Sequence, residues 1–137
     1  MRFWDASAIV PLIAQEQATE LLLKLFETDD QMIVWWASRV EILSALNRLQ
    51  REKRINKLAP FLEKLNELSQ IWQIVLPSAE ILENAERLLR LHPLRAADAL
   101  QLSAAIVAAD YRPKSLVFVC RDQKLNEAAQ REGFETV

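Results

Sequence analysis

The amino-acid sequence predicts an α/β protein in which helices cover both faces of a central parallel sheet. Short apolar and β-branched runs alternate along the chain with longer segments whose apolar residues recur at helical spacing. This alternation is typical of parallel sheets, because a crossover between two parallel strands needs a helix. With 137 residues, 51% of them hydrophobic and 26% charged, we expect a single domain over residues 1–137.

Four apolar runs are expected to form the main strands, and a fifth run at the end of the chain is expected to form an edge strand. Each main run is rich in aromatic or β-branched residues, and most of them lead into a polar residue. The expected strands are residues 2–4, 32–36, 72–76, 116–120 and, at the edge, 135–137. We therefore predict a parallel sheet of four to five strands.

Six segments with apolar residues at helical spacing separate or follow these strands. The expected helices are residues 8–27, 39–53, 58–71, 79–91, 96–109 and 122–132. Pro60 suits the first turn of its helix, and Gly133 suits the position just after the last one. Ser38, with Glu41 three residues later, fits a capping box, in which both side chains bond to N–H groups at the start of one helix.

The two adjacent tryptophans at the end of the second expected strand point to opposite faces of the sheet. Because helices should cover both faces, we expect Trp35 and Trp36 to pack in the core. Stacking on a nucleic-acid base is the alternative for either ring.

The composition excludes several classes of function. The single glycine excludes a phosphate-binding P-loop and a dinucleotide fingerprint, each of which needs at least two. The single histidine excludes a multi-histidine zinc site, and the single cysteine excludes an internal disulfide. The net charge of −2 is not that of a general polyanion binder. No apolar run is long enough to span a membrane and no secretory leader is evident, so we expect a cytoplasmic protein.

Four acidic residues fall where a parallel sheet forms its sites. Asp5 follows the first strand, Glu41 and Asp98 lie in the first turns of helices, and Asp122 follows the strand at 116–120. In an open α/β sheet these positions converge outside the carboxyl ends of the strands. Carboxylates that share a cleft repel one another, and a divalent cation relieves that repulsion. With oxygen ligands only, the cation expected is Mg²⁺ or Mn²⁺.

Each acid also has a purely structural explanation. Glu41 and Asp98 could be helix N-terminal residues favoured by the dipole, and Asp122 could be an N-cap. Asp5 is the hardest to explain in this way, because its neighbours are apolar and a buried carboxylate needs a partner. For Asp5 we expect that partner to be the cation rather than a residue of the protein. The spacing of the residues leaves both explanations of the cluster open.

Taken together, four segments resemble a PIN domain, most closely a VapC-type toxin ribonuclease of a toxin–antitoxin pair. They are FWDASAIVPLI, VWWASRVEILSALNRLQRE, HPLRAADALQLSAAIVAA and VFVCRDQKLNEAAQREGF, in this order along essentially the whole chain. The resemblance implies a three-layer α/β/α sandwich and Mg²⁺- or Mn²⁺-dependent endonucleolytic cleavage of RNA that leaves 5′-phosphate and 3′-hydroxyl ends. It also implies a cognate antitoxin and a homodimer.

The resemblance also assigns roles to residues of this chain. Its four family acids match Asp5, Glu41, Asp98 and Asp122. Our hypothesis is that Asp5, Asp98 and Asp122 bind the metal and that Glu41 orients or deprotonates the attacking water.

Two further residues are expected to support the acids without holding the metal. The family hydroxyl after the first acid matches Ser7, which we expect to bond Asp5 or a metal-bound water. Cys120 stands where the family commonly has Thr or Ser, and a thiol is a weaker hydrogen-bond partner than a hydroxyl.

Three arginines are candidates for holding the phosphates of RNA beside the acids. Arg48 and Arg51 lie on the same expected helix as Glu41, and Arg95 lies one turn before Asp98. Arg48 and Arg51 have a structural alternative, because cations are common near the carboxyl end of any solvated helix.

Three other functions compete with the nuclease. A catalytically silent PIN domain that binds RNA or protein is the main alternative. A phosphoacceptor receiver domain is disfavoured, because only Asp5 follows the first strand and Arg121-Asp122, not Lys, follows the strand at 116–120. A helical interaction protein is disfavoured by the β-rich runs at 32–36 and 116–120.

Overall fold

The computed structural model describes residues 1–137 and contains a five-stranded parallel sheet. The strands are β1 (Arg2–Trp4), β2 (Met32–Trp35), β3 (Trp72–Val75), β4 (Val117–Val119) and β5 (Glu135–Thr136). Their order across the sheet is β3-β2-β1-β4-β5, and every neighbouring pair is parallel. The predicted parallel sheet is confirmed, including the short edge strand at the end of the chain.

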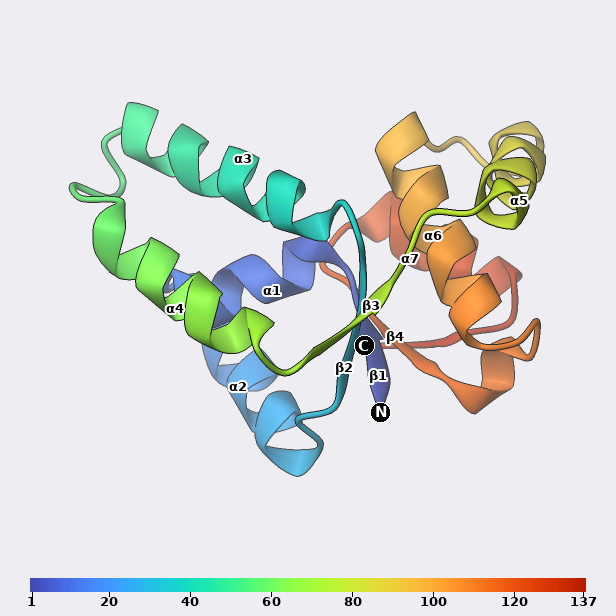
Figure 1. Ribbon diagram of the computed structural model, residues 1–137, viewed down its shortest axis with the longest axis horizontal. Helices are drawn as coiled ribbons and strands as arrows, with labels where there is room; N and C mark the ends of the chain where they lie inside the picture. The colour runs from blue at the N-terminus through green and yellow to red at the C-terminus, as the bar shows by residue number, and fades with distance from the viewer.

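Helices cover both faces of this sheet, as Figure 1 shows. One layer contains α1 (Ala6–Ile13), α2 (Thr19–Thr28), α3 (Ser38–Arg51) and α4 (Ala59–Ser69). The other contains α5 (Ala79–Leu91), α6 (Ala96–Ala108) and α7 (Gln123–Arg131), with a short 3-10 turn at Pro113–Ser115 before β4. The expected three-layer α/β/α sandwich is therefore confirmed. No helix in it is both long and apolar enough to cross a membrane.

Alternate residues of the central strands divide the core into two clusters. Phe3 of β1 stacks on Phe118 of β4, with ring centroids 5.5 Å apart, in the cluster beneath α5, α6 and α7. Trp4, the next residue, points to the opposite face and packs beneath α1 and α2. Phe3 and Trp4 are therefore buried on opposite faces of β1, and the residue that follows them is the acid Asp5.

The prediction of one helix over residues 8–27 is wrong, because the chain leaves the helix after Ile13 and starts another at Thr19. The Thr19 hydroxyl donates to the carbonyl of Pro11 at 2.8 Å and accepts the N–H of Glu16 at 2.8 Å. These bonds close a tight connection between α1 and α2. Apolar residues recur at helical spacing on both sides of it, so periodicity alone does not reveal the break.

The prediction that both adjacent tryptophans pack in the core is half right. Trp35 is buried between β2 and the α5–α7 layer, whereas Trp36 is 58% exposed. Trp36 lies just beyond β2, at the rim of the sheet, where no helix covers it.

The strand order changes direction at β1, and this change positions the site. From β1 the chain proceeds to β2 and β3 on one side, and later to β4 and β5 on the other. The crevice outside the carboxyl ends of β1 and β4 is the place where open α/β sheets bind ligands. The N–H of Asp5 donates to the carbonyl of Val119 at 2.9 Å, so the ends of the two strands are fixed together.

Candidate active site

Asp5 lies at the carboxyl end of β1 and caps α1. Its Oδ2 atom accepts hydrogen bonds from the N–H of Ser7, at 2.9 Å, and from the Ser7 hydroxyl. The side chain is therefore paired by residues of the protein, and the expectation that Asp5 lacks such a partner is wrong. The expected contact with Ser7 is present. All of the hydrogen bonds from the chain reach Oδ2, so Oδ1 is available to a ligand.

Asp122 lies opposite Asp5, at the start of α7. It caps that helix by accepting the N–H of Leu125 at 2.8 Å through Oδ1. Its own N–H donates to the Sγ atom of Cys120 at 3.3 Å, and that sulfur lies 3.6 Å from Asp5 Oδ2. Cys120 is completely buried and links the two acids across the ends of β1 and β4.

Glu41 and Asp98 come from two helices, each in the first turn, as predicted. Asp98 is on α6 and Glu41 is on α3, which lie on opposite faces of the sheet (Figure 1). The carboxylate of Glu41 accepts a hydrogen bond from Gln101 Nε2 at 3.2 Å. Both acids project toward the edge of the sheet where β1 and β4 end.

One cavity of about 190 Å³ brings the four acids together. Residues of α1, α3 and α6 line it, together with the N-cap residues of α1 and α7: Asp5, Ala6, Ser7, Val10, Glu41, Ala45, Arg48, Asp98 and Asp122. Residues that are up to 117 positions apart in the sequence, as Asp5 and Asp122 are, therefore share one opening.

Three of the four carboxyl groups have raised pKa values, because they are buried close to one another. Burial raises the pKa of Asp5, and the charge of Asp98 adds to the rise. Burial, followed by the charge of Asp5, raises the pKa of Glu41 to about 7. Burial and the charge of Asp122 also raise the pKa of Asp98. The cleft therefore resists full ionisation and favours a ligand that brings positive charge.

The residues present suit a hard divalent cation by their chemistry. The cavity offers carboxylate oxygens and one hydroxyl, and no histidine lines it. In their present positions no three acidic side chains lie close enough together to hold an ion. Mg²⁺ keeps several of its waters when protein carboxylates bind it, so a site with one or two direct ligands still fits this cation.

The three predicted substrate-binding arginines differ in their positions. Arg48 lines the cavity from α3. Arg95 immediately precedes α6, and its charge lowers the pKa of Asp98, against the larger effect of burial. Arg51, one turn after Arg48, is exposed and is not part of the cavity lining.

The pattern interpreted as a capping box at the start of α3 has a different role. No side chain caps α3; the position before it is Ala37. Ser38 and Glu41 instead both accept hydrogen bonds from Gln101 Nε2 on α6, at 2.8 Å and 3.2 Å. The capping-box prediction is therefore wrong, and Gln101 is a polar residue of the site that sequence reasoning missed.

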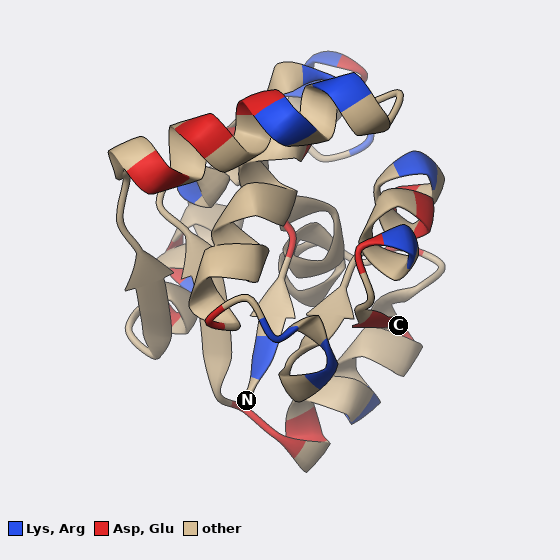
Figure 2. Cartoon of the chain, turned by 90° about the vertical axis from the view of Figure 1, so that its right-hand side faces the viewer, with Lys and Arg blue, Asp and Glu red and all other residues tan.

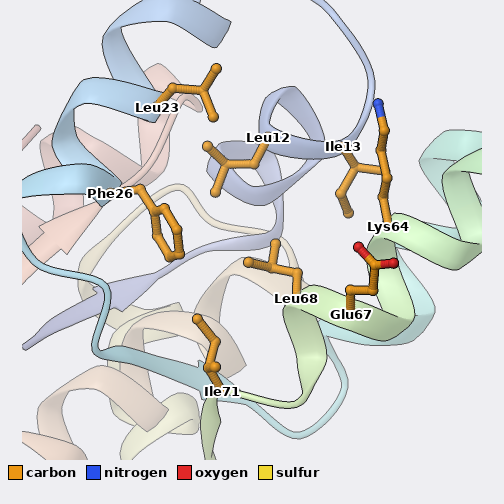
Figure 3. A pocket seen from close by; sticks show the side chains of 8 residues that line it. All are labelled: Leu12, Ile13, Leu23, Phe26, Lys64, Glu67, Leu68 and Ile71. Atoms are coloured by element: carbon orange, nitrogen blue, oxygen red, sulfur yellow. The ribbon is translucent and has the colours of Figure 1, made fainter.

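A second, apolar groove lies between α1, α2 and α4 (Figure 3). Leu12, Leu23, Phe26 and Leu68 point into it from the three helices and Ile71 from the turn after α4, with Lys64 and Glu67 at its rim. Glu67 is the one acidic residue that lines this groove. The groove therefore lacks the cluster of carboxylates found in the cleft and is not a candidate for catalysis.

One family of known proteins matches most of the chain. The model of a family described as the PIN domain matches residues 2–130. Two curated relatives from Mycobacterium tuberculosis, Ribonuclease VapC45 (strain CDC 1551 / Oshkosh) and Ribonuclease VapC49 (strain ATCC 25618 / H37Rv), are each 26% identical over 134 residues. These alignments cover 96% of this chain and 90% of each relative.

Two solved structures have a similar fold. A toxin-antitoxin complex from Klebsiella pneumoniae contains a chain that superposes with a TM-score of 0.63 at 18% identity, covering 90% of this chain and 88% of that one. FitAcB from Neisseria gonorrhoeae contains a chain with a TM-score of 0.61 at 11% identity, covering 99% and 96%. At these identities the likeness concerns the fold alone.

Proposed function

We propose that this chain, which belongs to the PIN-domain family, is a metal-dependent endoribonuclease and the toxin of a toxin–antitoxin pair. In this proposal residues 1–137 form a single nuclease domain that acts on RNA in the cytoplasm. One observation carries the proposal: four carboxylates, from the β1–α1 junction, α3, α6 and the β4–α7 connection, line one cavity, and three of them have raised pKa values. Such a cluster is costly without a cation.

Asp5, Asp98 and Asp122 are proposed to hold Mg²⁺ or Mn²⁺, directly or through its waters. Ser7 fixes the Asp5 carboxylate by two hydrogen bonds, so that Oδ1 faces the ligand. When bound, the cation supplies Lewis-acid stabilisation of the negative charge that develops on the phosphate.

Glu41 is the proposed general base. A carboxyl with a pKa of about 7 accepts a proton from water far more readily than one at the usual value, and it is still partly ionised at neutral pH. The water oxygen bonds to phosphorus while the P–O3′ bond breaks, and Glu41 takes the proton that the attacking water loses. The leaving O3′ atom takes a proton from solvent water, which gives a 5′-phosphate and a 3′-hydroxyl.

Arg48 and Arg95 are proposed to hold RNA phosphates at the mouth of the cleft. Arg48 lines the cavity, and Arg95 lies close enough to affect Asp98 electrostatically. Arg51, which is outside the cavity, is proposed to contact a phosphate farther along the strand.

The catalytically silent binding module is the alternative function. It retains the fold and the arginines but requires no cation and no base. Cleavage of RNA by the wild-type protein, and its loss in Asp98→Asn, separates the two functions.

A cognate antitoxin is the first proposed partner. Support comes from one of the similar solved structures, which is a toxin-antitoxin complex, and from the VapC names of the two relatives. The reading frame beside this gene is expected to encode a small DNA-binding protein that binds this chain and suppresses its cleavage of RNA.

A second copy of the chain is the other proposed partner, and α5 is the proposed contact. Along α5 the acidic residues Glu80, Glu83 and Glu86 come first and the basic residues Arg87 and Arg90 follow, as Figure 2 shows in red and then blue. Leu82 and Leu89 are 57% and 44% exposed on the same helix.

An antiparallel pair of α5 helices related by a two-fold axis would satisfy both features. In this pair Leu82 packs against Leu89 of the second copy, and Glu83 lies beside Arg90 of the second copy. Because of the two-fold symmetry, each of these contacts occurs twice in the dimer. The charge order of α5 is thus complementary to itself, which supports a homodimer through this face.

A further inference from the structure

Gln101 is the one completely buried amide that bonds to an acid of the cleft. It lies on α6, nearly one turn after Asp98, and its side chain is 0% exposed. Nε2 donates to the Ser38 hydroxyl at 2.8 Å and to Glu41 Oε1 at 3.2 Å. A single amide group therefore connects α6 to the first turn of α3 across the end of the sheet.

This amide is the sole hydrogen-bond donor that the chain supplies to the Glu41 carboxylate. The other acids are fixed in other ways: Asp5 by Ser7, and Asp122 by the N–H of Leu125. Glutamate has three rotatable side-chain bonds, so without this donor the direction of the carboxylate relative to the cavity would be poorly defined.

Stability alone does not explain the choice of glutamine here. The Oε1 atom of Gln101 is buried and has no hydrogen-bond partner. An unpaired buried acceptor lowers the stability of the folded state, and an apolar side chain of the same size would avoid that penalty. The amide is therefore better explained by what its Nε2 atom holds than by packing.

We propose that Gln101 is a positioning residue for RNA cleavage: it fixes the Glu41 carboxylate toward the cavity, and Ser38 fixes the amide in turn. The inference rests on the proposed nuclease function, in which Glu41 is the base. Gln101 does not itself line the cavity, so it acts through Glu41 and not on the substrate.

The chain contains a matched control at another contact of the same helix. Asn84 of α5 donates through Nδ2 to the Ser103 hydroxyl of α6 at 3.2 Å, and both residues are buried. This pair is also an amide bonded to a serine at a helix–helix contact, but neither residue lines the cleft. Asn84→Leu therefore reports the effect of losing a buried amide without touching the site.

The experiment measures kcat and KM for an RNA substrate with the wild-type protein, Gln101→Met and Asn84→Leu. The assays contain Mn²⁺ and are run at a temperature below the Tm of all three proteins. Gln101→Met should lower kcat between about tenfold and a hundredfold with KM changed less than about threefold, because the base is misplaced while substrate binding is retained. Asn84→Leu should lower Tm and leave kcat within about twofold.

The same substitution in a Glu41→Ala background tests whether Gln101 acts through Glu41. Gln101→Met should then change kcat by less than about twofold, because the group that it positions is absent. The inference is overturned if Gln101→Met lowers kcat in the Glu41→Ala background as much as it does in the wild-type protein, or if Gln101→Met alone has the wild-type kcat. Neither result contradicts the nuclease function. A wild-type protein that does not cleave RNA contradicts the nuclease function itself.

Discussion

The Sγ atom of Cys120 lies 3.6 Å from the Oδ2 atom of Asp5, so the first residue of the β4–α7 connection contacts the first acid of the chain. The same sulfur accepts the N–H of Asp122 at 3.3 Å. Burial, and after it the charge of Asp5, raises the pKa of Cys120, which keeps the thiol protonated and able to donate to the carboxylate.

Cys120→Ser is expected to retain cleavage or increase it, whereas Cys120→Ala is expected to lower it. Serine keeps a donor for Asp5 and an acceptor for the Asp122 N–H, and a hydroxyl makes the stronger bond. Alanine removes both the donor and the acceptor, and we expect this to lower the cleavage rate about threefold to tenfold. Initial cleavage rates of the two variants check this order, and an alanine variant that is as active as the serine variant contradicts it.

Mn²⁺ is expected to raise the Tm of the wild-type protein by about 4 to 6 °C at a concentration tenfold above its dissociation constant. The reason is that the cation relieves repulsion among the acids of the cleft. Thermal unfolding with and without Mn²⁺ measures the shift.

Asp122→Asn should lose most of that shift, because it removes one proposed ligand. Asp110→Asn is the matched control, since Asp110 has an 83% exposed side chain and lies outside the cavity. An equal shift in all three proteins would place the bound cation somewhere other than the cleft.

The metal-free protein is expected to be less stable at pH 8 than at pH 5. The pKa of Glu41 is raised to about 7 in the folded state, above its value of about 4.3 in the unfolded chain. Its stabilising contribution is complete below the unfolded value and is lost as the pH rises through the folded value.

Glu41→Gln removes this titration and should therefore flatten the dependence. Allowing for the partial exposure of Glu41, the change is on the order of 1 kcal/mol. Urea unfolding of the wild-type protein and of this variant at both pH values measures it. The same slope in both proteins would show that Glu41 does not titrate in this range.

Reversal of one charge on α5 is expected to weaken the proposed dimer about tenfold. Glu83→Arg puts like charges together across the two-fold axis, and Arg90→Glu does the same from the other side. The double variant restores opposite charges and should restore the dimer. Sedimentation equilibrium of the three proteins checks this, with Arg112→Glu, an exposed change outside α5, as the control. A dimer that is insensitive to both single changes would form through another face.

Much of the fold could be predicted from the sequence, because local properties determine it. Buried parallel strands need apolar, β-branched residues, and the runs around Phe3, Val34 and Phe118 have them. The convergence of the four acids could also be predicted, because the carboxyl ends of parallel strands necessarily share one edge of the sheet.

The rest depends on contacts that local patterns do not encode. Ser38 and Glu41 have the spacing of a capping box, yet both bond to Gln101, 60 or more residues away, because α6 approaches the start of α3. The break after Ile13 is likewise set by a threonine hydroxyl that meets a carbonyl eight residues back. Within DALQLSAA, the glutamine three residues after Asp98 is the only local signal of its role.

Cleavage of RNA by wild-type protein and by Asp98→Asn, with Mn²⁺ and with chelator, tests the central claim most directly. Asparagine keeps the size of aspartate but removes the charge, so the fold should persist and can be checked by Tm. The wild-type protein should cleave RNA only with the metal present, and Asp98→Asn should be slower by at least about a hundredfold. Cleavage that survives the chelator, or a folded Asp98→Asn protein as active as the wild type, would contradict the metal-dependent nuclease function.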